Sequence, residues 1–212
     1  LFAALPPAER SPSLPEPAGG SSSVEEIVVP GGEQAHLYVG QLTVPAGHAD
    51  VPALQIAAVA LGSGPGLVGR IPARIRERDG LAYGAGATTV GGAGRLPGRL
   101  VVHVATAPRR VESALAAVRQ ELEHFVAGGI TQQELEEART YLLGSEPFRR
   151  ESARQMAAVG GRAMLYGVDW DEPGWLEKAL GGLERADVDR AVRRHLDLDR
   201  LSVTVGRPAG GA

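Results

Sequence analysis

The order of strand-like and helix-like segments restricts the fold of this chain more than any other feature of its sequence. Apolar residues with strand spacing occur over 24–29, 34–44, 81–90, 99–107 and 201–205, and helical patterns lie between the second and third strands and between the fourth and fifth. The glycine-rich turn at 30–32 predicts that the first two strands form a hairpin or near-hairpin. Because strands and helices do not alternate as repeated βα units would, a doubly wound parallel sheet is disfavoured. We therefore predict an α+β fold with a mainly antiparallel sheet and helices packed largely on one face.

The helical block carries clear periodicity and start signals. One apolar stripe runs along a predicted helix through Val111, Leu115, Val118, Leu122 and Phe125, and Gly128-Gly129 ends it. The next helix begins at a T-x-x-E capping box of residues 131–134. Shorter helices are predicted over 52–61, 71–78, 149–164, 175–180 and 187–196.

The two ends of the chain differ in composition from the middle. Residues 1–23 contain five prolines and end in three serines, so we expect a linker or N-terminal arm there. We expect one folded unit over 24–208 and a short tail over 209–212. The chain opens on Leu1 without a signal-peptide pattern, which indicates a piece of a longer protein.

Composition excludes several classes of partner. The 22 Lys and Arg residues against 25 Asp and Glu give a formal net charge of -3, so no basic field gathers nucleic acid. The sequence has no apolar window long enough to span a bilayer, and its lack of cysteine excludes disulfides and thiolate chemistry. We expect a soluble protein with neither a nucleic-acid nor a membrane partner, in a bacterial cytoplasm.

Two short motifs suggest chemistry that their context does not support. Residues 64–69 satisfy G-x-G-x-x-G, but a helix precedes them and the acidic residue required about 20 positions later is absent, so an interhelical loop is favoured over a nucleotide site. Residues 120–124 approach H-x-x-E-H, but Gln120 stands where the first zinc ligand should be. No Ser-His-Asp arrangement can be identified either. We therefore predict no bound cofactor and no complete catalytic machinery in this chain alone.

The segment over 60–88 carries a more specific resemblance. A helix ends in small residues and glycines, a short arginine-bearing helix follows, and Asp79-Gly80-Leu81-Ala82-Tyr83 comes next. The similarity continues through 107–111, 129–139 and 186–188, and covers about 24–208. This pattern resembles the second, non-zinc half of the insulinase/pitrilysin-type metallopeptidases, the family with the inverted zinc motif.

The resemblance implies a role for two residues. In that family the second half supplies an arginine and a tyrosine seven positions apart, which reach the substrate at the zinc of the other half. Arg76 and Tyr83 have this spacing, whereas Arg78, the competing candidate, lies five positions from Tyr83. From composition alone, Arg76 would be an exposed helix residue and Tyr83 a half-buried strand residue. The glycines at 62, 64, 66 and 69 occupy the place of the family's small-residue loop and are expected to permit close helix packing.

The resemblance also implies a partner. The chain would be the substrate-binding half of a zinc metalloendopeptidase, acting with a zinc-bearing half that lies upstream in the same polypeptide or in a separate subunit, as a heterodimer or a homodimer. Its ligand would be a peptide, and the zinc would reside in the partner half. The alternative is a catalytically inactive scaffold or assembly subunit of the same family.

Overall fold

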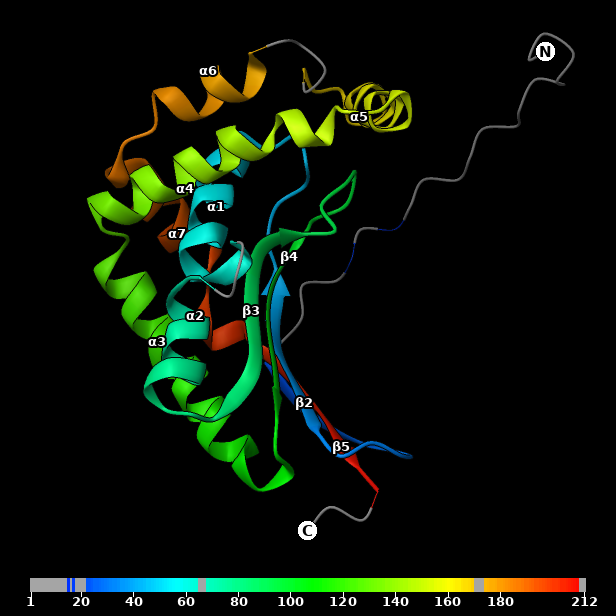
Figure 1. Cartoon of the computed structure of the whole chain (residues 1–212), viewed down its shortest axis with the longest axis vertical. Coiled ribbons are helices and arrows are strands. Elements are labelled where there is room, and N and C mark those ends of the chain that lie inside the picture. The colour runs from blue at the N-terminus through cyan, green and yellow to red at the C-terminus, as the bar shows by residue number, and fades with distance from the viewer. Residues whose placement is uncertain (1–14, 16, 18–21, 65–67, 170–173, 210–212) are drawn as a thin grey trace, which may run out of the picture.

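The computed structural model describes residues 15, 17, 22–64, 68–169 and 174–209, which form a two-layer α+β structure (Figure 1). Its five-stranded sheet has the order β1-β5-β2-β4-β3. The strands are β1 (Ser23–Val29), β2 (Ala35–Leu42), β3 (Ala82–Gly91), β4 (Arg99–Thr106) and β5 (Ser202–Pro208). β1 pairs with β5 in parallel, and the other three neighbouring pairs are antiparallel. The predicted α+β fold with a mainly antiparallel sheet is confirmed.

The predicted hairpin between the first two strands is wrong, because β5 lies between β1 and β2. β5 places Val203 and Val205 in the core and hydrogen-bonds to a strand on each of its edges. The five residues over 30–34 then have to span two strand spacings, roughly 10 Å, which is well within their reach. A glycine-rich turn therefore predicted a change of direction correctly, but not which strands are neighbours.

Helices cover one face of the sheet (Figure 1). The main helices are α1 (Val51–Ala58), α2 (Arg70–Pro72), α3 (Val111–Gly128), α4 (Gln132–Ser145), α5 (Ala153–Tyr166), α6 (Trp175–Gly181) and α7 (Arg185–His195), and π-helical turns η2 (Val59–Ser63) and η4 (Ala73–Arg78) continue α1 and α2. The shorter 3₁₀ turns are η5 (Pro108–Arg110), η6 (Pro147–Arg149) and η7 (Leu198–Arg200). α5 begins later than predicted because Ser152 and Gln155 form a capping box at its start.

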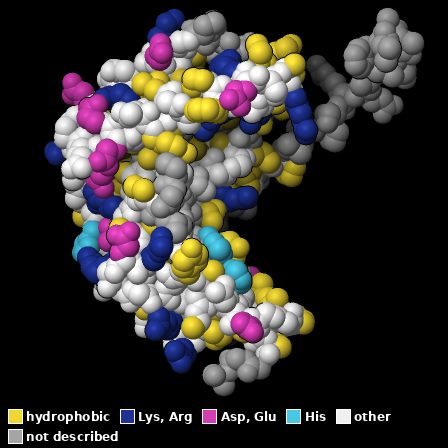
Figure 2. Space-filling model, in the orientation of Figure 1, with side chains coloured by type: hydrophobic (Ala, Val, Ile, Leu, Met, Phe, Trp, Pro, Cys, Tyr) yellow, Lys and Arg dark blue, Asp and Glu magenta, His cyan; other side chains and the backbone are white. Residues whose placement is uncertain are grey.

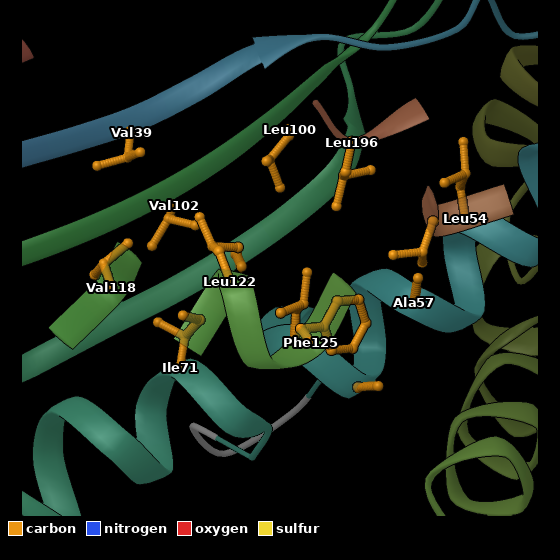
Figure 3. Packing of buried hydrophobic residues seen from close by; sticks show 14 of the residues in the cluster. Val39, Leu54, Ala57, Ile71, Leu100, Val102, Val118, Leu122, Phe125 and Leu196 are labelled. Carbon is orange, nitrogen blue, oxygen red and sulfur yellow. The ribbon is translucent and has the colours of Figure 1, made fainter. Parts of the chain in front are cut away.

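The core lies between the helix layer and the sheet. Val118, Leu122 and Phe125 of α3 point toward Leu100 and Val102 of β4 (Figure 3), and all five are fully buried. Of the predicted α3 stripe, only Leu115 is half-buried. Gln120 and His124 lie on the exposed side of α3, which confirms that the H-x-x-E-H-like segment is a solvated helix face.

The capping box predicted at the start of α4 is present. The backbone N–H of Glu134 donates to the Thr131 hydroxyl at 3.1 Å, and the backbone N–H of Thr131 donates to the Glu134 carboxylate at 2.7 Å. Arg70 also donates to both carboxylate oxygens of Glu134, at 2.6 and 2.7 Å. Burial alone would raise the pKa of Glu134, but the hydrogen bonds from Arg70 and Thr131 and the guanidinium charge outweigh it and lower that pKa. This ion pair ties the start of α4 to α2.

The opposite face of the sheet is left open by the helices. Tyr38 is 46% exposed on this face, and a cavity of about 630 Å³ lies over β1, β2 and β5 beside it. Figure 2 shows the molecule hollowed on this side. Helix α5 stands apart from the other helices (Figure 1).

The predicted terminal segments lie largely outside the described residues. Of the arm expected over 1–23, the structure describes only residues 15, 17, 22 and 23, and of the tail expected over 209–212 only Ala209. Both remain predictions. None of the helices in the described ranges is long and apolar enough to cross a membrane.

Candidate functional site

Arg76 and Tyr83 are brought together by the turn that connects η4 to β3. The helix ends at Arg78, Gly80 takes a positive φ of 59°, and the N–H of Leu81 donates to the carbonyl of Ile75 at 2.8 Å. Glycine adopts this left-handed conformation without the steric cost that a side chain would add.

A buried threonine fixes where β3 starts. The hydroxyl of Thr106 donates to the carbonyl of Leu81 at 2.6 Å, and only 2% of Thr106 is exposed. Because this bond is shielded from water, it defines the position of the residues that follow Leu81. Tyr83 is therefore two residues from an anchored point of the sheet.

Tyr83 is the extra residue of a β-bulge. Ala82 pairs with Thr106 and Gly84 pairs with Ala105, so two residues of β3 advance against one of β4 and Tyr83 has no partner in the ladder. A bulge re-aims the side chain of its extra residue. As a result 77% of Tyr83 is exposed, which contradicts the half-buried strand tyrosine expected from composition.

The guanidinium of Arg76 lies over the ring of Tyr83. The distance from Arg76 Cζ to the ring centroid is 5.1 Å, within the range of a cation–π interaction. Arg76 is exposed, and within the described part of the chain no carboxylate forms an ion pair with it. The guanidinium therefore retains N–H groups that can bind a peptide carbonyl or carboxylate.

The neighbouring arginines have other partners. Arg78 forms an ion pair of 3.4 Å with Asp79, and its side chain is 61% exposed. Arg74 donates to the same carboxylate at 2.6 Å and to the side chain of Gln120 at 3.0 Å. Of the two candidates for pairing with Tyr83, only Arg76 contacts its ring.

The glycine loop is a packing element where the structure describes it. A Cβ on Gly69 would lie 2.6 Å from the backbone of Gly62, and a Cβ on Gly62 would lie 2.7 Å from the ring of Pro72. The predicted close packing is confirmed at these two positions. Gly64 would meet only ordinary contacts, and Gly66 lies outside the described residues.

Two histidines and an aspartate meet in a cluster that the sequence did not predict. The Oδ2 atom of Asp50 lies 2.7 Å from His195 Nε2, 4.0 Å from His48 Nδ1 and 3.3 Å from Arg194. The hydrogen bond with His195 lowers the pKa of Asp50, and the charges of His195, His48 and Arg194 add to this effect, whereas partial burial opposes it. Because 145 residues separate Asp50 from His195, no local motif signals the contact.

The nitrogen and oxygen atoms of this cluster that could bind a metal ion already form hydrogen bonds or ion pairs. His48 Nδ1 accepts the backbone N–H of Asp50 at 3.1 Å, and Oδ2 of Asp50 is shared between His195 and Arg194. A metal ion would have to displace these bonds and tolerate the guanidinium. The cluster fits an ion-pair clasp between the start of α1 and the end of α7 better than it fits a zinc site.

A second unpredicted cluster lies on the open face of the sheet. His36 Nδ1 is 3.1 Å from His103 Nε2, and the Tyr38 ring centroid is 4.6 Å from that of His103. Burial, followed by the charge of His36, lowers the pKa of His103. The lowered pKa favours the uncharged form of His103 near neutral pH.

Comparison with protein families gives one match that covers most of the chain. Residues 1–142 match the family model described as "Peptidase M16 inactive domain". The non-peptidase homolog YmxG of Helicobacter pylori is 24% identical over 187 residues, which cover 85% of this chain and 41% of that protein.

Solved structures agree in fold. The peptidase M16 inactive domain from Pseudomonas fluorescens superposes with a TM-score of 0.82 at 26% identity, covering 98% of this chain and 48% of that one. The inactive peptidase domain of a predicted zinc protease from Bordetella parapertussis superposes with a TM-score of 0.70 at 20% identity, covering 92% and 94% of the two chains. The chain thus spans about half the length of the Pseudomonas and Helicobacter relatives. It belongs to the M16 peptidase family and matches that family's inactive domain, as the resemblance predicted.

Proposed function

We propose that this chain is the substrate-binding, non-zinc half of a zinc metalloendopeptidase and that it hydrolyses peptides only together with a zinc-bearing half. The observation that carries this proposal is the exposed Tyr83, which a β-bulge turns outward and whose ring centroid lies 5.1 Å from the guanidinium carbon of Arg76. A tyrosine with 77% of its surface exposed contributes little to the core, so its position needs another reason.

The chemistry of the two side chains suits peptide hydrolysis. Negative charge develops on the scissile carbonyl oxygen in the transition state, and the phenolic O–H of Tyr83 would donate to it. The guanidinium of Arg76 would hold a substrate carbonyl or carboxylate through its N–H groups and stays charged at any working pH. Zinc in the partner half would supply the activated water, and neither residue of this chain would ionise during turnover.

Exposed apolar side chains on helix α5 support the proposal that this chain binds a partner. Helix α5 lies apart from the other helices (Figure 1). Its residues Met156, Met164 and Leu165 are 59%, 85% and 57% exposed. Three large apolar side chains exposed along one helix offer area that a partner could bury. The chain also spans only about half of the related Pseudomonas chain, which supports a second half of similar size.

The test is reconstitution. The region encoded upstream of Leu1 and the neighbouring gene are searched for H-x-x-E-H, and the half that carries it is produced together with this chain. We expect cleavage of a quenched fluorogenic peptide only when both halves are present. If neither region encodes an H-x-x-E-H half, or if the pair cleaves no peptide, the proposal fails.

A second candidate function is an inactive scaffold subunit, and one finding favours it. The Helicobacter relative is described as a non-peptidase homolog. The scaffold function requires that the chain assemble with a partner without hydrolysis. The contact between Arg76 and the exposed Tyr83 favours the enzyme, because the scaffold function does not require hydrogen-bond donors at this position.

A further inference from the structure

Strand β1 is the most exposed apolar element of the sheet. All seven of its residues are exposed, and among them Val24 and Val28 reach 73% and 66%, and Ile27 and Val29 reach 44% and 46%. An edge strand that shows apolar residues and free backbone groups to water is prone to pair with another chain. Folded proteins normally shorten, charge or cover such an edge.

Its apolar residues face both sides of the sheet. In the parallel register Val24 lies beside the buried Val203 and Val28 beside Arg207, which places them on the helix side. Ile27 lies beside Gly206 and lines the cavity on the open side with Val29. The helix layer therefore stops short of β1, and no described element covers either face of the strand.

One edge of β1 is also free. The strand pairs with β5 along one side and stands last in the sheet order, so the backbone groups on its other side bond to no other strand in the described part of the chain. The two apolar faces and the free edge together fit an added β-strand whose own apolar side chains cover both faces.

The charges of β1 decide against a second copy of this chain as the added strand. The antiparallel register that pairs all seven residues would place Glu26 opposite Glu26 of the other copy, and like charges in that position destabilise a pair. Glu26 already binds Arg207 at 2.6 Å, whereas Glu25 points to the open side beside Thr204 and forms no ion pair with any described residue. An Arg or Lys on the added strand would complement Glu25.

We propose that β1 is the docking edge for the zinc-bearing half, which adds an apolar strand carrying a basic residue opposite Glu25. This inference rests on the proposed function, since it takes the zinc-bearing half as the partner. The length of the relatives supports the zinc-bearing half as the partner. This chain covers only 48% of the Pseudomonas protein and 41% of the Helicobacter protein, so about half of such a protein is available to cover β1.

The test measures binding between this chain and the zinc-bearing half produced as its own chain. We expect Val28→Lys and Glu25→Lys each to raise the Kd at least tenfold, because one adds charge to an apolar face and the other reverses the complementary charge. Val68→Lys is the matched control, since Val68 is 60% exposed but lies in the loop before α2, and its Kd should stay within twofold of the wild type. Hydrogen exchange over 24–29 should slow in the complex.

The outcomes separate the two proposals. If the wild-type chain forms no complex with the zinc-bearing half, the proposed function fails and this inference fails with it. If the complex forms and cleaves peptide while Val28→Lys and Glu25→Lys bind as tightly as the wild type, only the docking edge is refuted. If the chain alone is a dimer that Val28→Lys dissociates, β1 pairs with a second copy and the inference is likewise refuted.

Discussion

The guanidinium carbon of Arg76 lies 5.1 Å from the centroid of the Tyr83 ring, although the two side chains come from a helical turn and a strand. The contact depends on the turn at Gly80 and on the bulge that frees Tyr83 from the ladder. A strand without the bulge would give Tyr83 a ladder partner. The pair is therefore a product of two backbone irregularities that follow one another within four residues.

Replacing Tyr83 with Phe tests the hydroxyl alone. In the reconstituted complex we expect kcat to fall on the order of a hundredfold or more, because a single donor at well-studied oxyanion sites is worth about 2.7–4 kcal/mol. The ring and its contact with Arg76 remain, so unfolding stability and zinc content should not change. Steady-state kinetics on one fluorogenic peptide measures the effect, and full activity of the variant would remove Tyr83 from the mechanism.

Replacing Arg76 with Ala should mainly raise KM, because its contact with the peptide would exist already in the ground state. Arg78→Ala is the matched control, since Arg78 lies two residues away, is exposed and pairs with Asp79 instead of Tyr83. We expect the control to stay close to wild type in the same assay. A larger loss in Arg78→Ala than in Arg76→Ala would show that the seven-residue pairing is misassigned.

The purified chain should hold no stoichiometric zinc. Its helices lack a two-histidine ligand pair, and the donors of the cluster of His48, Asp50 and His195 are already in use. Metal analysis by mass spectrometry after incubation with zinc and dialysis should find far less than one zinc per chain. One tightly held zinc that is lost in His195→Ala would identify the cluster as a metal site, and loss in His124→Ala would identify the H-x-x-E-H-like segment instead.

The pair of Arg70 and Glu134 should make stability depend on pH. The folded-state pKa of Glu134 lies below the ordinary value of a glutamate, so its stabilising contribution is present above that ordinary value and is lost as pH falls through the folded-state pKa. Glu134→Gln should lower the free energy of unfolding by about 1.5–3 kcal/mol at pH 7, the range for hydrogen bonds to charged groups, and by less at pH 3.5.

Urea denaturation at the two pH values measures this difference. Glu137→Gln is the control, because Glu137 is exposed on the same helix and its carboxylate accepts from the side chain of Gln133. We expect little change for the control at either pH. An equal loss of stability for Glu134→Gln at both values would mean that the ion pair does not contribute.

Gly69→Ala tests the close approach of Gly69 to the backbone of Gly62 in η2. The new Cβ would lie 2.6 Å from the backbone of Gly62, and the φ of 123° at Gly69 is unfavourable for any side chain. Backbone strain and overpacking each cost about 1–3 kcal/mol, so thermal unfolding should shift down strongly. Gly144→Ala in α4 meets nothing within 4 Å and should stabilise the protein by about 0.5–1 kcal/mol through helix propensity.

The sequence by itself determined the elements whose signals are local. The stripe of α3, the capping box at Thr131 and the helical turn before Asp79 were predictable because each depends on residues three to seven positions apart. The family resemblance selected Arg76 and Tyr83, and the structure places them in contact. The helical pattern over 149–164 predicts a start a few residues before Ala153, whereas the Ser152 capping box sets the start of α5 in the structure.

Only the tertiary structure decided the features that depend on strand neighbours and on distant residues. The insertion of β5 between β1 and β2 and the meeting of Asp50 with His195 join segments more than 140 residues apart, and no local pattern encodes such a pairing. The exposure of Tyr83 depends on its bulge, a shift of register against β4 that cannot be read from β3 alone. Each strand could pair with several others, and the arrangement that buries the apolar face of every strand is the one that forms.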